Sequence, residues 1–258
     1  MRNTKKLVIA NWKMAPDTPK IAKEIFSVIK RQASKLNKIE VVICPPSIYL
    51  GSLADRAGKT TRLVIGAQDV FWENSGAFTG EISPDMIRFS GAKYVIVGHS
   101  ERRALGETNE IVSQKVLAGI KSGLTVILCV GEGERDDHVR YLDVLKNQIR
   151  ESLKSVKKSE LNFVIIAYEP IWAISTAHKG AMLPTDLHEM VIFIRKVISD
   201  IYGQEKAMAL SVLYGGSIDD ENVGDLVEKG QADGILVGHN SLNPEEFNRI
   251  LKVVNDLK

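Results

Sequence analysis

The sequence predicts an α/β protein with one domain, residues 1–258, built as a (β/α)8 barrel. Short segments that are almost entirely apolar recur eight times, and amphipathic helical patterns separate them. Apolar runs without polar alternation are typical of parallel strands that are buried on both faces. A chain of 258 residues also has the usual length of a one-domain barrel. The predicted strands are Leu7–Trp12, Val41–Cys44, Leu63–Ala67, Tyr94–Gly98, Thr125–Val130, Phe163–Tyr168, Leu210–Tyr214 and Gly234–Val237.

The alternative fold is an open, doubly wound sheet. Such a sheet normally has fewer strands and carries a glycine-rich phosphate loop after the first one. Here the first strand runs into Asn11-Trp12-Lys13, which contains no glycine. The strand count and this junction therefore favour the barrel.

The segments between the strands carry helix signals. Apolar residues recur at helical spacing from Leu187 to Ile201, and Asp186 is the predicted N-cap of that helix. Asn243, followed by proline and two acids, predicts the start of another helix. A helix near Ile111–Lys121 is expected to end at Gly123.

The composition excludes several classes of function. The net charge is +2 with both signs interspersed, which predicts no nucleic-acid partner. No run approaches the ~20 apolar residues of a membrane span, and Leu7–Ala10 is too short for a signal peptide. Cys44 and Cys129 lie in apolar runs, which predicts buried, reduced thiols and a cytoplasmic protein. No metal-ligand spacing occurs, so we expect neither a metal nor another cofactor.

Polar residues follow several of the predicted strands. In a barrel, the carboxyl ends of all strands meet at one face, where active sites lie. The carboxylate of Glu169, the imidazole of His99, the ammonium group of Lys13 and two glycine-containing loops would converge there. The residues at the ends of these strands are Asn11 and Lys13, His99 to Glu101, Glu169, Gly215-Gly216-Ser217 and Gly238-His239.

These residue types predict proton transfer on a small phosphorylated sugar. Glu169 would remove a proton from a carbon next to a carbonyl group, while His99 and Lys13 stabilise charge on the oxygen. A helix that starts at Ser100 would keep the imidazole neutral through its partial positive charge. Backbone N–H groups after the last two strands would hold phosphate.

The motifs resemble the triosephosphate isomerase family from end to end. The segments that carry the resemblance are Ala10–Met14, Cys44–Pro46, Gly66–Gln68, Gly76–Glu81, Val97–Arg103, Cys129–Glu132, Ala167–Ile174 and Tyr214–Ser217.

The resemblance implies a TIM barrel that interconverts glyceraldehyde 3-phosphate and dihydroxyacetone phosphate in glycolysis and gluconeogenesis. It implies that Glu169 is a general base and His99 a neutral imidazole electrophile. It further implies that Lys13 is a cation beside them, Asn11 a polar residue of the site and Glu101 a supporting carboxylate. The implied phosphate contacts are Ser175, Ser217, Gly238 and His239. It also implies a homodimer that locks through the Asp69–Glu81 loop, with Thr79 at the tip.

The chain departs from the family pattern at two places. Ser175-Thr176-Ala177 replaces Gly-Thr-Gly in a lid segment that continues to Leu183 and is longer than usual, and Gly238-His239 replaces Gly-Gly. Either only backbone N–H groups touch phosphate, or His178, Lys179 or His239 reshapes the pocket for a longer sugar phosphate. If a replaced glycine needed a positive φ, the substitution would cost on the order of 1 kcal/mol. A cost of that size does not decide between these two interpretations.

Two alternative functions stay open on the sequence alone. One is an aldose–ketose isomerase for a four-carbon sugar phosphate, which the altered lid and Gly238-His239 motivate. The other is a non-catalytic barrel that binds phosphate. The presence of all four chemistry-bearing residues, Asn11, Lys13, His99 and Glu169, speaks against it.

Overall fold

A computed structural model describes residues 5–58, 62–135, 139–174 and 182–257. Eight parallel strands close into a barrel in which each strand pairs with its neighbours in the chain and β1 pairs with β8. The predicted fold is therefore confirmed. The strands are β1 Lys6–Asn11, β2 Ile39–Cys44, β3 Leu63–Ala67, β4 Tyr94–Val97, β5 Thr125–Val130, β6 Val164–Tyr168, β7 Ser211–Tyr214 and β8 Gly234–Val237.

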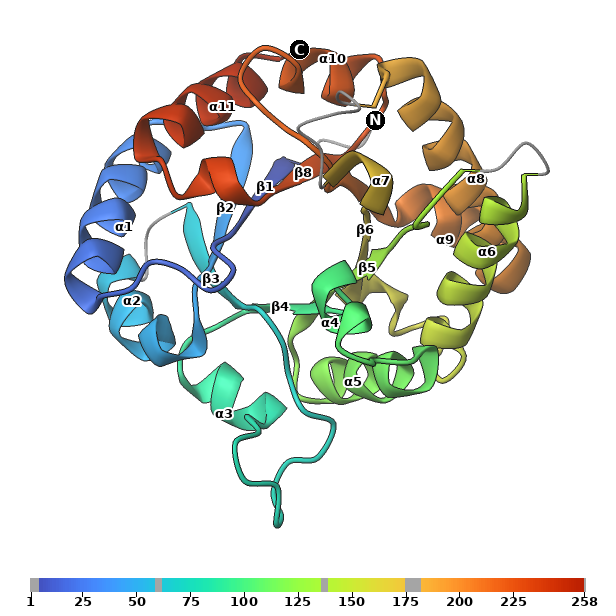
Figure 1. Cartoon of the computed structure of the whole chain (residues 1–258), viewed down its shortest axis with the longest axis horizontal. Coiled ribbons are helices and arrows are strands. Elements are labelled where there is room, and N and C mark those ends of the chain that lie inside the picture. The colour runs from blue at the N-terminus through green and yellow to red at the C-terminus, as the bar shows by residue number, and fades with distance from the viewer. Residues whose placement is uncertain (1–4, 59–61, 136–138, 175–181, 258) are drawn as a thin grey trace.

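Helices form a ring around the strands, and one segment between β3 and α3 projects beyond that ring (Figure 1). In the described residues the helices are α1 Pro19–Ala33, α2 Leu50–Ala57, α3 Pro84–Phe89, α4 Ser100–Ala104, α5 Asn109–Lys121, α6 Arg140–Leu153, α7 Ile171–Ile174, α8 Pro184–Tyr202, α9 Gln204–Ala209, α10 Val223–Glu228 and α11 Pro244–Asp256. Three short 3-10 turns, Ser47–Tyr49, Leu161–Phe163 and His239–Ser241, complete the connections.

Several strand ends differ by one or two residues from the prediction, and two of the differences have local causes. β4 ends at Val97 because Gly98 has a φ of 71° and cannot continue an extended strand. β6 begins after the 3-10 turn Leu161–Phe163, so Phe163 is not part of it.

Helix boundaries followed the capping signals in two of three cases. Asn243 caps α11 by accepting hydrogen bonds from the next N–H groups, and α5 ends before Gly123, whose φ is 78°. The predicted N-cap Asp186 is wrong, because α8 already begins at Pro184. Proline has no N–H to satisfy and its fixed φ suits the first helical position, so the helix starts earlier and Asp186 lies in its first turn.

The core has two layers that the strands separate. Alternate strand residues point into the barrel, where Ile9, Cys44 and Cys129 belong to one buried cluster. The others point outward and pack against the helices in a larger cluster. Both cysteines are free and buried, as predicted, and burial raises the pKa of each thiol. In the described ranges no helix has the length and hydropathy that a membrane span needs.

Candidate active site

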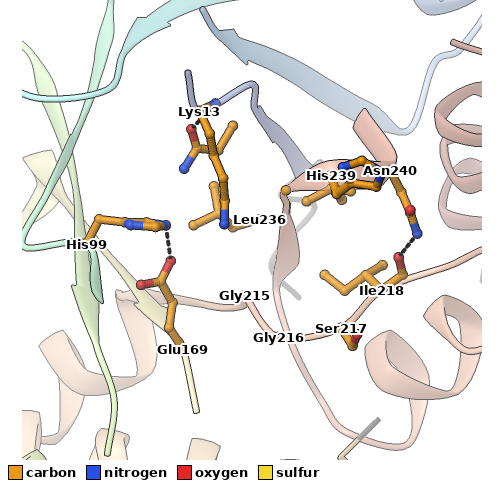
Figure 2. Close-up of a pocket in the computed structure, with 13 residues that line it drawn as sticks. Lys13, His99, Glu169, Gly215, Gly216, Ser217, Ile218, Leu236, His239 and Asn240 are labelled. Carbon is orange, nitrogen blue, oxygen red and sulfur yellow. Dashed lines mark hydrogen bonds and ion pairs between the residues drawn. The ribbon is translucent and has the colours of Figure 1, made fainter. Parts of the chain in front are cut away.

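The carboxyl ends of the strands surround one pocket that contains most of the predicted site residues (Figure 2). Lys13, His99 and Glu169 gather at one end of this pocket, and His239 and Asn240 lie at the other. The strand order places residues that are far apart in sequence at this single face. Residues that line the pocket are Asn11, Lys13, His99, Glu169, Gly215, Gly216, Ser217, Ile218, Leu236, Val237, Gly238, His239 and Asn240.

Glu169 and His99 face each other in the buried part of the pocket. Their side chains are 3% and 8% exposed, and His99 Nε2 lies 3.3 Å from Glu169 Oε1. The other carboxylate oxygen accepts a hydrogen bond of 3.3 Å from the Ser100 N–H. Glu169 follows β6 directly and its own N–H donates to the Val130 carbonyl at 2.8 Å. The carboxylate is therefore fixed through both its main chain and its side chain.

His99 has the hydrogen-bonding pattern of a neutral imidazole. It caps α4, which begins at Ser100 as predicted, and its Nδ1 accepts the Glu101 N–H at 3.2 Å. A ring nitrogen that accepts a hydrogen bond carries no proton, so the proton of the neutral ring lies on Nε2. The Glu101 carboxylate is 3.7 Å from Nδ1, beyond hydrogen-bond distance. Nε2–H is thus the donor that faces the pocket.

Lys13 is held at the pocket in an unusual backbone conformation. Its φ is 53°, in the left-handed region that non-glycine residues seldom adopt. The Asn11 side chain accepts the Lys13 N–H at 3.0 Å, and Gln68 Nε2 donates to the Lys13 carbonyl at 2.8 Å. Lys13 Nζ pairs with Glu101 at 2.7 Å. Asn11 and Glu101 therefore both act on the lysine.

Gln68 is a residue of the site to which the sequence analysis gave no role. Besides the Lys13 carbonyl, its Nε2 also donates to the Cys44 carbonyl, at 2.9 Å. It follows β3 directly, so its signal in the sequence is a polar residue at the end of a predicted strand.

Glycines lie where the backbone approaches the reactive side chains most closely. A β-carbon at Gly215 would lie 2.9 Å from Cγ of Glu169, and one at Gly131 would lie 1.9 Å from its carbonyl oxygen. A β-carbon at Gly238 would lie 3.3 Å from Cε of Lys13. A side chain at Gly131 or Gly215 would displace Glu169, and one at Gly238 would press on Lys13.

Three of the predicted phosphate contacts, Ser217, Gly238 and His239, line the far end of the pocket, where Asn240 Nδ2 donates to the Ile218 carbonyl at 2.7 Å. His239 is not among the residues with positive φ and starts a 3-10 turn, so replacement of a glycine at this position causes no strain. Ser175, the fourth predicted phosphate contact, lies outside the described residues, as do His178 and Lys179.

Glu132 organises the residues on either side of Glu169. Its Oε1 accepts hydrogen bonds from the Tyr168 hydroxyl at 2.7 Å, from Trp172 Nε1 at 3.0 Å and from Arg135 Nε at 3.2 Å. Burial raises the pKa of the Tyr168 hydroxyl, which therefore stays protonated and donates. Glu132 ends the Cys129–Glu132 motif, but the sequence alone indicates no role for it.

The charge of Glu169 acts on a buried thiol nearby. Burial is the main cause of the raised pKa of Cys129, and the negative charge of Glu169 raises it further. Cys129 is consequently a neutral thiol beneath the carboxylate, not a nucleophile. Within the described residues no group of three or more His, Cys, Asp or Glu side chains could hold a metal ion.

The projecting segment Asp69–Glu81 is anchored at its base by charges. Asp69 receives Lys115 Nζ at 2.8 Å and Arg102 Nη2 at 3.1 Å. Residues 73–81, which include Thr79, are exposed. Phe78 is 43% exposed, although its ring packs on Phe71 with centroids 4.6 Å apart. The segment thus presents polar and aromatic side chains away from the barrel.

The sequence is similar to those of known proteins from one family. The sequence model of the triosephosphate isomerase family matches residues 6–254. The triosephosphate isomerase of Thermoanaerobacter pseudethanolicus is 40% identical over 250 residues, which are 95% of this chain and 98% of the relative. That of Dictyoglomus thermophilum is 39% identical over 255 residues, 96% and 99% of the two chains. That of Trichlorobacter lovleyi is 38% identical over 252 residues, 95% and 97% of the two chains.

Proposed function

This chain belongs to the triosephosphate isomerase family and is an isomerase of triose phosphates, and we propose that Glu169 carries the proton in its reaction. The observation that carries the proposal is the buried pair of Glu169 and His99, with 3.3 Å between Oε1 and Nε2. Both side chains border the same pocket, so the carbon acid and the carbonyl oxygen of a substrate that binds there can each reach one of the two groups.

The proposed step starts from the ionised carboxylate. Glu169 takes the proton from the carbon next to the carbonyl group, and the C–H electron pair forms the C=C bond of an enediolate. The carbonyl π electrons move to the oxygen, where His99 Nε2–H and the Lys13 ammonium group stabilise the charge. His99 Nε2 gives its proton to the former carbonyl oxygen and takes one from the neighbouring hydroxyl oxygen, whose carbon becomes the new carbonyl carbon. Glu169 then returns its proton to the carbon that carried the original carbonyl group, which completes the exchange of aldehyde and ketone.

We place the phosphate of the substrate at the end of the pocket away from Glu169. Ser217, Gly238 and His239 line that end, and Ser175 is proposed to join them. Backbone N–H groups bind phosphate oxygens without a formal charge. Lys13 lies with His99 and Glu169, and its side chain also reaches Gly238, so Lys13 is proposed to contact the substrate between its phosphate and its carbonyl group. No metal or organic cofactor has a part in this mechanism.

We propose a cytoplasmic homodimer as the working form in glycolysis and gluconeogenesis. The exposed Asp69–Glu81 segment supports it, because two copies could exchange these segments, with Thr79 reaching toward the partner's pocket. Sedimentation equilibrium tests the assembly: a monomer at micromolar concentration would contradict it.

The decisive experiment replaces the base. Glu169→Gln and Glu169→Ala are expected to lower kcat by about a hundredfold to ten-thousandfold, which is what a general base contributes. Activity is measured on glyceraldehyde 3-phosphate in a coupled assay, with circular dichroism to confirm folding. A folded Glu169→Gln variant with wild-type activity would remove Glu169 from the mechanism. Loss of turnover in that variant excludes a non-catalytic barrel.

The second candidate function differs only in the length of the substrate. Two departures from the family pattern favour it: Gly238-His239, which lines the pocket, and the sequence of Ser175–Leu183. We expect a higher kcat/KM on the triose phosphate than on a tetrulose phosphate assayed beside it. A higher kcat/KM on the tetrulose phosphate would make the second candidate function the preferred one.

A further inference from the structure

Gln148, on the outer helix α6, holds both polar groups of one residue at the end of β5. Its Oε1 accepts the Gly131 N–H at 2.8 Å, and its Nε2 donates to the Gly131 carbonyl at 3.0 Å. The two bonds fix the orientation of the peptide units on both sides of Gly131. A glycine backbone has no side chain to restrict it, so this external pair determines where the segment lies.

The segment that Gln148 holds lies directly against the main chain of Glu169. The Val130 carbonyl accepts the Glu169 N–H at 2.8 Å. A β-carbon on Gly131 would be 1.9 Å from the Glu169 carbonyl oxygen and 2.5 Å from its carbonyl carbon. Residues 130 and 131 therefore fix the position of Glu169 on two sides, and a shift of Gly131 moves Glu169.

The next residue extends this control to the neighbours of Glu169. Glu132 Oε1 binds the Tyr168 hydroxyl and Trp172 Nε1, and the Glu132 carbonyl accepts the Ile171 N–H at 3.0 Å. Residues before and after Glu169 are thus attached to the residue that follows Gly131. A rotated Gly131 carbonyl would reorient the Glu132 backbone as well.

We propose that Gln148 is a positioning residue for the proton-transfer step, which acts on Glu169 through the Gly131 peptide groups. This inference rests on the proposed role of Glu169 as the base. Proton transfer depends on the placement of the base within a fraction of an ångström, whereas the phosphate end of the pocket belongs to residues 215–217 and 238–240. Gln148 consequently controls kcat and leaves substrate affinity alone.

Two variants separate hydrogen bonding from packing. Gln148→Glu has nearly the same shape and keeps an acceptor for the Gly131 N–H. At neutral pH, however, an ordinary glutamate is ionised, so its second oxygen would face the Gly131 carbonyl without a proton to donate. Gln148→Leu removes both bonds. The matched control is Leu145→Ala, which destabilises the same helix from a fully buried position.

The readouts are kcat and KM for glyceraldehyde 3-phosphate, the inhibition constant of inorganic phosphate, and the thermal midpoint. Both Gln148 variants are expected to lower kcat by about tenfold to a hundredfold, the cost of a base that is misplaced by up to an ångström. KM and the phosphate inhibition constant stay at their wild-type values. Leu145→Ala lowers the thermal midpoint and keeps kcat.

Three results would overturn the proposal. One is a folded Gln148→Glu protein with the kcat of the wild type, since packing alone would then explain the residue. Another is a kcat loss in Leu145→Ala as large as that in the Gln148 variants, and the third is a change confined to KM. If Gln148→Leu does not fold, Gln148→Glu decides. Glu169→Gln is assayed in parallel. If Glu169→Gln is inactive and Gln148→Glu is normal, only the positioning role of Gln148 is wrong. If Glu169→Gln is fully active, the assignment of Glu169 as the base is wrong.

Discussion

The α-carbon of Gly215 packs against the side chain of Glu169. A β-carbon there would lie 2.9 Å from Cγ and 3.5 Å from Oε1 of the carboxylate. The two residues come from the ends of adjacent strands, and the Gly215 N–H donates to the carbonyl of Tyr168 at 2.8 Å. This contact leaves the carboxylate no room to move toward β7.

Gly215→Ala should therefore impair catalysis more than folding. The added methyl group displaces Glu169, so we expect kcat to fall on the order of tenfold to a hundredfold. Gly51→Ala is the control, because a β-carbon at Gly51 meets no atom within 4 Å. Steady-state kinetics and thermal unfolding measure both. Unchanged kinetics in Gly215→Ala would show that Glu169 tolerates the displacement.

His99→Gln should reduce the catalytic step and spare binding. The bond from His99 Nε2–H strengthens as charge grows on the substrate oxygen, so its loss appears in kcat and not in KM. We expect kcat to fall by about a hundredfold, the lower end of the cost of one oxyanion donor. A variant that raises KM with kcat preserved would make His99 a binding residue only.

His239→Gly should leave both kcat and inhibition by inorganic phosphate as they are. His239 is exposed, and backbone N–H groups can bind phosphate oxygens without a side chain, so an N–H group is the expected phosphate contact. A weaker phosphate inhibition constant in this variant would instead show that the imidazole contributes. Ser217→Ala, assayed beside it, reports on the other side of the same end.

Lys115→Met should destabilise the fold. The Lys115 side chain is 2% exposed and pairs with both Asp69 and Glu107. Its removal leaves Arg102 as the cation that still pairs with both carboxylates, so we expect a loss below the ~3–5 kcal/mol of a fully broken buried pair. Denaturant unfolding measures the loss. Lys196→Met, which removes an exposed pair with Asp200, should change the free energy of unfolding very little.

The same cluster predicts a loss of stability in acid. Burial acts to raise the pKa of Glu107, but hydrogen bonds from Lys115 and Arg102 outweigh it and hold the pKa below the ordinary value. Stability from Glu107 is thus present above the ordinary glutamate range and is lost as pH falls through its lowered pKa. Asp69 opposes it, because burial raises the Asp69 pKa. Glu107→Gln should flatten the acid limb of stability against pH, and an unchanged limb would assign it elsewhere.

The sequence predicted the barrel because local patterns determine it. Apolar runs, capping residues and terminal glycines report on segments of a few residues, and the structure confirmed eight strands from them. Asp186 failed as an N-cap because two start signals compete within three residues, and the proline at 184 prevails. Asn11, Lys13, His99 and Glu169 could be grouped because each follows a strand, and parallel strands end at one face.

Residues that act through other residues could not be found in this way. Gln148 lies in the middle of an amphipathic helix, where a glutamine is typical of the solvent-facing side. Its reach to Gly131 depends on how α6 packs over β5, which no pattern in the sequence records. Gln68 directly follows a predicted strand, but its two hydrogen bonds to the carbonyls of Lys13 and Cys44 depend on the register of three strands.

The pairing of β1 with β8 has a consequence for shortened forms of the chain. Lys13 follows β1, and Gly238, against which its side chain packs, follows β8. A chain that lacks β8 has an open barrel with two unpaired edges, at β1 and β7, and its pocket lacks Gly238. A chain cut short before residue 234 is therefore expected to expose these strand edges and to show no turnover.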